Sequence, residues 1–129
     1  MDSIRNVDYT ILICNDLPRT TTFYRDVMRF PIVTQRENWV DFRVGSSILS
    51  LRTRIAQGGF EDGPHLDDGS ASVQIAFRVP PSKIDDCYRE LLRQSVPIVR
   101  APVELSTWGH QMFLFRDPEG NLLEIYAEI

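Results

Sequence analysis

The feature of this sequence that most constrains its fold is an order of predicted elements that occurs twice. In the first half, apolar alternation and helical spacing predict a strand, a helix and three strands, at 7–14, 18–29, 31–37, 39–45 and 48–54. The second half predicts the same order, at 72–79, 83–94, 96–102, 110–117 and 122–128. A supersecondary order repeated with a period of about 65 residues indicates two copies of one βαβββ unit.

An acidic, glycine-rich segment separates the two copies. Residues 56–70 (AQGGFEDGPHLDDGS) contain four Gly, one Pro and four acidic residues, a composition that is typical of a linker. The 129 residues have the length of one ordinary domain. We therefore predict a single domain over 1–129, with the first repeat at about 5–55 and the second at about 71–129.

Each predicted helix has a candidate N-cap. Asp16 precedes the first helix, and Pro18 suits the first turn of that helix. Ser82 follows two prolines and is the candidate cap of the second helix. The two cysteines, Cys14 and Cys87, lie among apolar residues without a CxxC or Cys/His cluster, which predicts two buried thiols and no structural zinc site.

The charge balance limits the partners to expect. The chain has 14 basic and 18 acidic residues and a formal net charge of −4, which argues against nucleic acid or an anionic membrane as partner. The first residues lack the basic and apolar regions of a signal peptide, and no apolar run approaches the ~20 residues of a membrane span. We expect a soluble cytoplasmic protein whose partner is a small molecule.

Two stretches carry a resemblance to a known family. The first is VDYTILICNDLPRTTTFYRDVMRF, with a strand, Asp-Leu, and a helix containing Phe-Tyr-Arg-Asp. The second is WGHQMFLFRDPEGNLLEIYA, with Trp-Gly, Phe-x-Asp-Pro-x-Gly-Asn and Leu-Glu-Ile. With these motifs the chain resembles the vicinal oxygen chelate superfamily over nearly its whole length. That superfamily includes glyoxalase I, fosfomycin-resistance enzymes, extradiol dioxygenases and metal-free bleomycin-binding proteins.

The resemblance implies an α+β fold. Two βαβββ repeats would form a curved mixed sheet shaped as a cup, with the helices outside, and two copies of the chain would form a homodimer. Because the superfamily spans many chemistries, the fold alone says little about the function.

The resemblance also implies four strand positions that hold metal ligands in the metal-dependent relatives. In this sequence Tyr9, Ser50, Gln74 and Glu124 occupy them. A divalent transition metal prefers His, Cys or carboxylate ligands at three or four positions. We therefore favour no cofactor, and keep as the alternative a divalent metal held by Gln74 and Glu124. Without a metal, Glu124 and Tyr9 are the candidate catalytic acid and base.

Strand alternation predicts which other side chains face the cup. The helix-facing sets are apolar, whereas the cup-facing set is polar: Tyr9, Asp41, Arg43, Ser50, Arg52, Gln74, Arg78 and Glu124. Two interpretations stay open. In one, these charges form exposed ion pairs on an open sheet. In the other, Arg52 or Arg78 binds an anionic or carbonyl-bearing ligand.

The aromatic side chains divide into candidate ligand contacts and core residues. The candidate contacts are Trp39, Tyr126, Trp108 and the adjoining His110. Phe113 and Phe115 alternate with Met112 and Leu114, so only one of these two pairs can face the cup. We expect the two phenylalanines in the core.

Three functions follow from these residues. The favoured one is a non-catalytic protein that binds and sequesters a small aromatic or peptide-like molecule. The second is a metal-dependent glyoxalase- or dioxygenase-like enzyme in which Glu124 ligates the metal or moves a proton. The third is a metal-free lyase or isomerase that uses Glu124 or Tyr9 as acid or base. The sequence lacks a Gly-x-Ser-x-Gly motif and a phosphate-binding loop.

Overall fold

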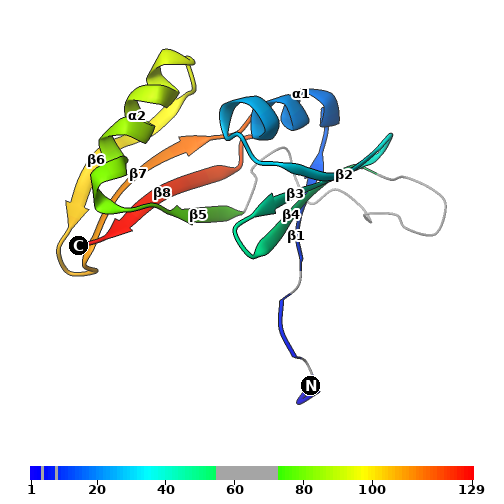
Figure 1. The fold of residues 1–129 in the computed structure, drawn as a ribbon, viewed down its shortest axis with the longest axis horizontal. Helices are drawn as coiled ribbons and strands as arrows, with labels where there is room; N and C mark the ends of the chain where they lie inside the picture. Colours follow the sequence, from blue (N-terminus) through cyan, green and yellow to red (C-terminus); the bar gives the residue numbers. More distant parts are fainter. Residues whose placement is uncertain (4, 8, 55–72) are drawn as a thin grey trace. The chain divides into compact units, whose positions relative to one another are not determined.

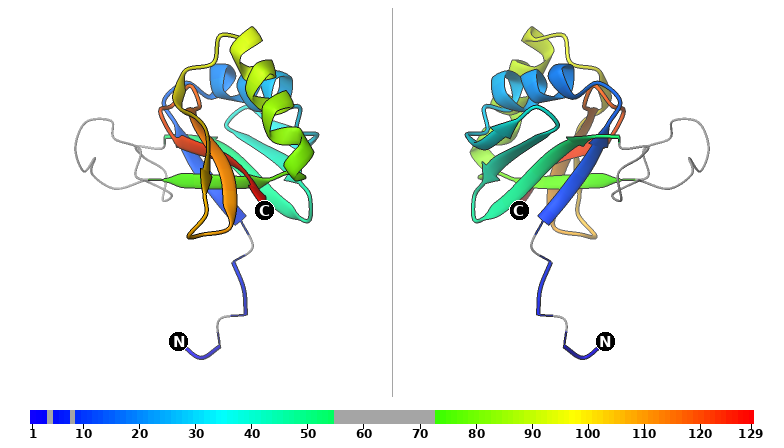
Figure 2. Two further views of the ribbon diagram at one scale, coloured as in Figure 1. Left: turned by 90° about the vertical axis from the view of Figure 1, so that its left-hand side faces the viewer. Right: turned by 90° about the vertical axis from the view of Figure 1, so that its right-hand side faces the viewer.

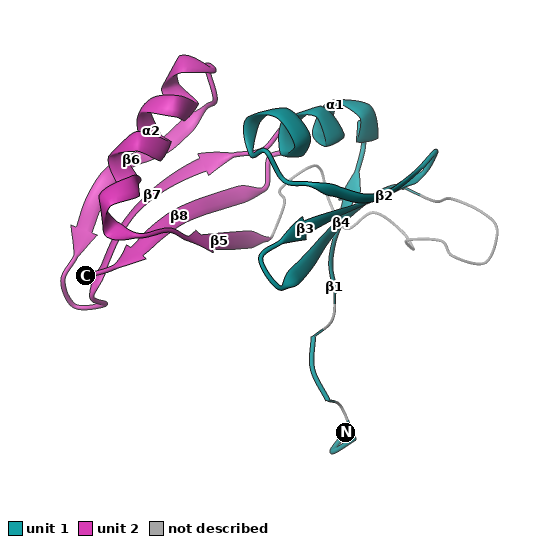
Figure 3. Ribbon diagram, in the orientation of Figure 1, with its two compact units in different colours: residues 1–66 teal, residues 67–129 magenta. Residues whose placement is uncertain are grey.

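The structure, a computed structural model, describes residues 1–3, 5–7, 9–54 and 73–129. They belong to two compact units, residues 1–66 and 67–129, which Figure 3 draws in teal and magenta. The boundary between the units falls in the predicted linker 56–70, which lies outside the described residues. The assignment of both units to one domain stays a prediction. None of the described helices is long and apolar enough to cross a membrane.

Unit 1 contains a four-stranded sheet, one α-helix and one π-helical turn. Its elements are β1 (Tyr9–Cys14), α1 (Leu17–Thr22), the π-turn η1 (Phe23–Val27), β2 (Ile32–Arg36), β3 (Trp39–Val44) and β4 (Ser47–Thr53). The strand order in the sheet is β1-β4-β3-β2. Strand β1 runs parallel to β4, and the other neighbours are antiparallel.

Unit 2 repeats this arrangement. Its elements are β5 (Gln74–Arg78), the 3₁₀ turn η2 (Pro81–Lys83), α2 (Ile84–Arg93), β6 (Ile98–Leu105), β7 (His110–Arg116) and β8 (Leu122–Glu128). The strand order is β5-β8-β7-β6, with β5 parallel to β8. Helix α2 lies along one face of this sheet, over β6, β7 and β8 (Figures 1 and 2). The predicted repeat and the α+β fold class are confirmed.

The core of each unit lies between its helix and its sheet. In unit 1, Tyr24 of η1 is fully buried and its ring contacts Phe42 of β3. In unit 2, Tyr88 of α2 contacts Phe113 of β7. Phe113 and Phe115 are both fully buried, which confirms that they belong to the core. Strand β8 alternates between this buried face and a half-buried opposite one, whereas Ser50 of β4 and Met112 of β7 are buried on the opposite face as well.

The helix predicted over 18–29 changes character after α1. In η1, Met28 N donates to Phe23 O at 3.1 Å, the i to i+5 spacing of a π-helix. The wider turn allows two consecutive aromatic residues, Phe23 and Tyr24, to be buried, and their rings meet edge to face at 5.2 Å. The spacing of apolar residues in the sequence predicts a regular helix and does not reveal this turn.

The two helices begin differently. Asp16 caps α1 as predicted, because its Oδ1 accepts a hydrogen bond from Arg19 N at 3.1 Å. The prediction that Ser82 caps α2 is wrong. Ser82 lies inside η2, and α2 begins at Ile84 without a side-chain cap. The cause is the proline pair at 80–81, which starts a 3₁₀ turn ahead of the helix.

Two further predictions need correction. The strand predicted at 96–102 is β6, which begins at Ile98 and continues to Leu105. It is an edge strand with irregular register against β7, and such a strand tolerates Pro102 without ending there. Cys14 is buried as predicted, whereas Cys87 on α2 is only half-buried.

The DPEGN segment between β7 and β8 is a turn held by its first residue. Asp117 Oδ1 accepts hydrogen bonds from Glu119 N and Asn121 N, both at 2.9 Å, and its Oδ2 accepts from Asn121 Nδ2 at 2.8 Å. Gly120 has a φ of +87°, which favours glycine. The motif therefore has a structural task, which is to turn the chain from β7 into β8.

Candidate functional site

The side of each sheet opposite its helix carries most of the predicted site residues, and we call it the distal face. On the distal face of unit 2, Gln74 of β5 and Glu124 of β8 contact each other directly. Gln74 Nε2 donates to Glu124 Oε2 at 2.8 Å. In the register of these parallel strands Glu124 lies opposite Ala76, two residues after Gln74. The two groups thus meet diagonally across neighbouring strands.

The distal face of unit 1 has the same register with other residues. Ser50 of β4 lies opposite Ile11, two residues after Tyr9 of β1. Tyr9 and Ser50 therefore stand where Gln74 and Glu124 stand in unit 2. The four positions that the resemblance singled out occupy equivalent places in the two repeats.

Ser50 is hydrogen-bonded to Asp41, a residue that strand alternation placed on this face but to which the sequence assigned no role. The Ser50 side chain is fully buried, and its Oγ donates to Asp41 Oδ1 at 2.5 Å. Trp39 Nε1 donates to the same oxygen at 2.7 Å. Strand alternation placed Asp41 on this face, but only the β3–β4 register, which sets it opposite Ser50, reveals its role. The indole nitrogen of Trp39 is thereby fixed by the protein.

Arg52 adjoins this cluster. It lies directly opposite Trp39 in the antiparallel register, so the two side chains are neighbours on the distal face. Arg52 Nη1 donates to Thr53 O at 3.2 Å. A half-buried guanidinium on the same face as Trp39 is able to receive an acidic or carbonyl group.

Two aromatic side chains meet on the distal face of unit 2. His110, the first residue of β7, lies 4.7 Å from Tyr126 of β8 between ring centroids, with the planes tilted by 35°. Trp108 lies in the turn before β7 and is 75% exposed. Within the described residues the indole of Trp108 makes no ring contact, so it is accessible at the end of this sheet.

Arg78 borders the same aromatic pair. It lies opposite Tyr126 in the register of β5 and β8, and its Nη1 is 3.0 Å from Glu128 Oε1. Both side chains of this ion pair are 64% exposed, so the pair adds little to stability. The guanidinium can exchange Glu128 for another anion at small cost.

The predicted site residues therefore form two groups. Unit 1 brings together Tyr9, Trp39, Ser50 and Arg52 on one distal face, and unit 2 brings together Gln74, Arg78, His110, Glu124 and Tyr126 on the other. Trp108 stands in a turn next to the second group. Their role in binding stays a prediction.

The donor set at the four positions does not fit the divalent metal that the metal-dependent relatives imply. It consists of a phenol, a hydroxyl that donates to Asp41, an amide that donates to Glu124, and one carboxylate. Over the described ranges, no group of three His, Cys, Asp or Glu side chains stands close enough to share one ion. A transition metal requires three or four such ligands, so we derive no step through a metal.

Comparisons with known proteins agree with this architecture. The family model described as the Glyoxalase/Bleomycin resistance protein/Dioxygenase superfamily matches residues 6–125. The chain is 31% identical over 125 residues to "Virulence protein STM3117" of Salmonella typhimurium, covering 95% of this chain and 83% of that protein. It is 25% identical over 126 residues to "Metallothiol transferase FosB" of Shouchella clausii, covering 96% of this chain and 81% of that protein.

A solved structure shows the same fold. The glyoxalase/bleomycin resistance protein/dioxygenase from Nocardioides has a TM-score of 0.83 and 19% sequence identity, with 98% of this chain and 85% of that chain covered. The sequence match, the repeated βαβββ units and this likeness lead to one conclusion. The chain belongs to the glyoxalase/bleomycin resistance protein/dioxygenase superfamily.

Proposed function

We propose that the chain binds a small molecule in the cup of its family fold, without a metal centre, and acts by holding or sequestering that molecule. The observation that carries the proposal is the hydrogen bond from Gln74 Nε2 to Glu124 Oε2. Gln74 and Glu124 are the two remaining candidate ligands, and the amide nitrogen of Gln74 occupies one carboxylate oxygen of Glu124. The buried hydroxyl of Ser50 donates to Asp41.

The distal faces indicate the chemistry of the ligand. The His110–Tyr126 pair and the exposed Trp108 offer ring faces to a planar molecule. Arg52 and Arg78 offer charge-assisted hydrogen bonds to a carboxylate or carbonyl oxygen. A planar molecule with an acidic or carbonyl group meets both requirements. We further propose a homodimer, as the family resemblance implies.

The metal question can be tested on protein purified without chelator or affinity tag. Elemental analysis should find no stoichiometric Zn, Ni, Mn or Fe, before or after soaking with divalent ions. One tightly held metal per chain would contradict the proposal. Glu124→Ala should then release that metal.

Ligand binding can be tested by the fluorescence of the two tryptophans, with naphthoate as a planar carboxylate probe. Arg52→Ala or Arg78→Ala should weaken binding by about tenfold, the loss of one charge-assisted hydrogen bond. The matched control is Arg89→Ala, an exposed arginine on α2. Equal affinity in all three variants would remove the arginines from the site.

A second candidate function has its own support. The similarity to the metallothiol transferase FosB favours an enzyme, and Glu124 and Tyr9 are its candidate catalytic residues. If the chain is a metal-free lyase or isomerase, Glu124→Gln would abolish turnover while leaving ligand affinity nearly unchanged. In a sequestering protein, there is no turnover for the variant to lose.

A further inference from the structure

A groove on the helix side of unit 1 lies apart from the distal face. It is a hollow of about 240 Å³ between α1, η1 and the β2–β3 hairpin. Leu17 and Val40 contribute apolar lining. Val40 points to the side of β3 opposite Trp39 and Asp41, because successive strand residues alternate. The groove is therefore separate from the candidate site described above.

Thr21 lines this groove and carries a buried hydroxyl without a partner in the described part of the chain. This residue of α1 is only 4% exposed, and the buried atom is its Oγ1. Buried polar atoms in folded proteins are almost always paired, so such an atom requires an explanation. Rotation of the Thr21 side chain toward the groove would allow an acceptor seated there to provide the missing partner.

Two arginines also line the groove. Arg25 belongs to η1, and π-turns occur often at functional sites. Its Nε and Nη2 bind the two carboxylate oxygens of Asp26 at 2.7 and 2.9 Å. Arg36 ends β2, and within the described residues no ion pair or hydrogen bond engages its guanidinium. Glu37 is the one acidic residue in the lining.

We propose that this groove is a second binding site, which takes the carboxylate or phosphate group of a small anion on Arg36, Arg25 and Thr21. All three side chains can donate hydrogen bonds, and the two guanidinium groups can only donate. The less polar part of the ligand rests on Leu17 and Val40. Asp26 competes with the ligand for Arg25.

The test is an NMR titration of the ¹⁵N-labelled full chain with inorganic phosphate and, separately, with acetate, at constant ionic strength. The amide signals of Thr21 and Thr22 and the Nε–Hε signals of Arg25 and Arg36 should shift together and saturate. Binding of both probes supports a shared anionic group. Binding of one alone supports the site and identifies the ligand class as phosphate or carboxylate.

Matched variants separate a site from general ionic attraction. Arg36→Gln should weaken phosphate binding by about tenfold, as expected for the loss of one charge-assisted hydrogen bond. Asp26→Asn should tighten it, because Arg25 is released from its competitor. Arg89→Gln on α2 should have no effect.

Thr21→Val tests the buried hydroxyl at nearly constant volume. The variant should fold, gain stability and bind phosphate more weakly. The proposal is overturned by the absence of saturable shifts, by equal affinity in wild type and Arg36→Gln, or by similar shifts at every arginine. Unchanged phosphate affinity in both Thr21→Val and Asp26→Asn would also overturn it.

Discussion

Unit 1 and unit 2 have the same strand order, and the first three strands in each order pair in equivalent register, yet their distal faces carry different chemistry. In unit 1 the residue opposite Ser50 on the neighbouring antiparallel strand is Asp41, which accepts the serine hydrogen bond. In unit 2 the residue opposite Glu124 is Leu114, which offers no polar group, and Glu124 turns instead to Gln74 on the other side. The repeat determines where a side chain points. The residue directly opposite on the neighbouring antiparallel strand determines whether that side chain is committed to the structure or available to a ligand.

The largest expected effect concerns the cores of the two units. Phe42 and Phe115 occupy equivalent places in the repeats, and both are fully buried. Phe42→Ala and Phe115→Ala should each destabilise the chain by about 3–5 kcal/mol, through lost burial and a cavity. Urea unfolding, monitored by circular dichroism, measures the loss of stability in each variant.

The same experiment tests whether the units form one domain. If they unfold together, each variant should shift a single transition that includes both units. Two separate transitions, with each variant moving only one of them, would contradict the prediction of one domain over 1–129 and make the repeats independent.

The next largest effect concerns the two polar pairs, Ser50–Asp41 in unit 1 and Gln74–Glu124 in unit 2. Ser50→Ala removes a hydrogen bond to a carboxylate from a fully buried side chain, and should cost about 1.5–3 kcal/mol. Gln74→Ala removes a hydrogen bond of an exposed side chain, and should cost less than about 1 kcal/mol. An equal loss of unfolding free energy in Ser50→Ala and Gln74→Ala would contradict the distinction between the committed Ser50–Asp41 pair and the available Gln74–Glu124 pair.

Single-strand patterns predicted which face each side chain occupies but not which side chains meet. The alternation in β7 is enough to place Phe113 and Phe115 on one face and Met112 and Leu114 on the other, because the period of two holds whatever the neighbours are. The role of Asp41 depends on the β3–β4 register, which no single strand contains. The bond between Gln74 and Glu124 depends likewise on the β5–β8 register. The sequence therefore predicts the positions of Gln74 and Glu124 on this face, but not the hydrogen bond between them.

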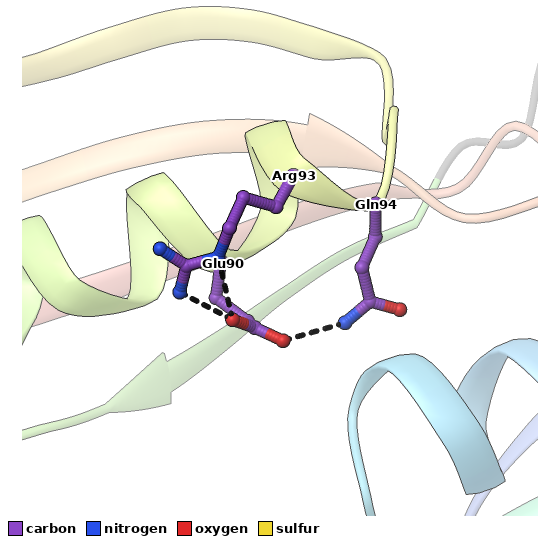
Figure 4. A network of polar contacts seen from close by, with 3 residues as sticks. All are labelled: Glu90, Arg93 and Gln94. Atoms are coloured by element: carbon purple, nitrogen blue, oxygen red, sulfur yellow. Dashed lines mark hydrogen bonds and ion pairs between the residues drawn. The ribbon is translucent and has the colours of Figure 1, made fainter.

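The ends of the two helical segments offer a further comparison. Arg29 after η1 and Ser95 after α2 both have a left-handed φ, +58° and +57°. After α2, Val96 N donates to Leu91 O and Ser95 N to Leu92 O, both at 3.0 Å, the pattern of a Schellman cap. In the last turn of α2, Glu90 accepts hydrogen bonds from Arg93 and Gln94 (Figure 4).

Ser95→Gly should stabilise the chain by about 1 kcal/mol, because glycine adopts the left-handed conformation without steric cost. Ser95→Ala is the matched control, since it removes the hydroxyl but keeps the Cβ atom. In thermal unfolding, Ser95→Gly should have a higher Tm than both the wild type and Ser95→Ala. Arg29→Gly should gain less, because Arg29 has an interaction of its own to lose.

The smallest effect concerns the ion pair beside the groove of unit 1. The hydrogen bonds from Arg25, followed by its charge, lower the pKa of Asp26 below its ordinary 3.8. A carboxyl group whose pKa is lower in the folded state stabilises the fold above its unfolded pKa, and that contribution disappears as the pH falls through the folded pKa. The urea midpoints of wild type and Asp26→Asn should therefore differ slightly at pH 6, and the difference should shrink progressively as the pH falls below about 3.8. Arg25→Gln should remove the same pH dependence, and the double variant should show no further loss. A difference that persists in acid would mean that Asp26 acts through packing rather than through its charge.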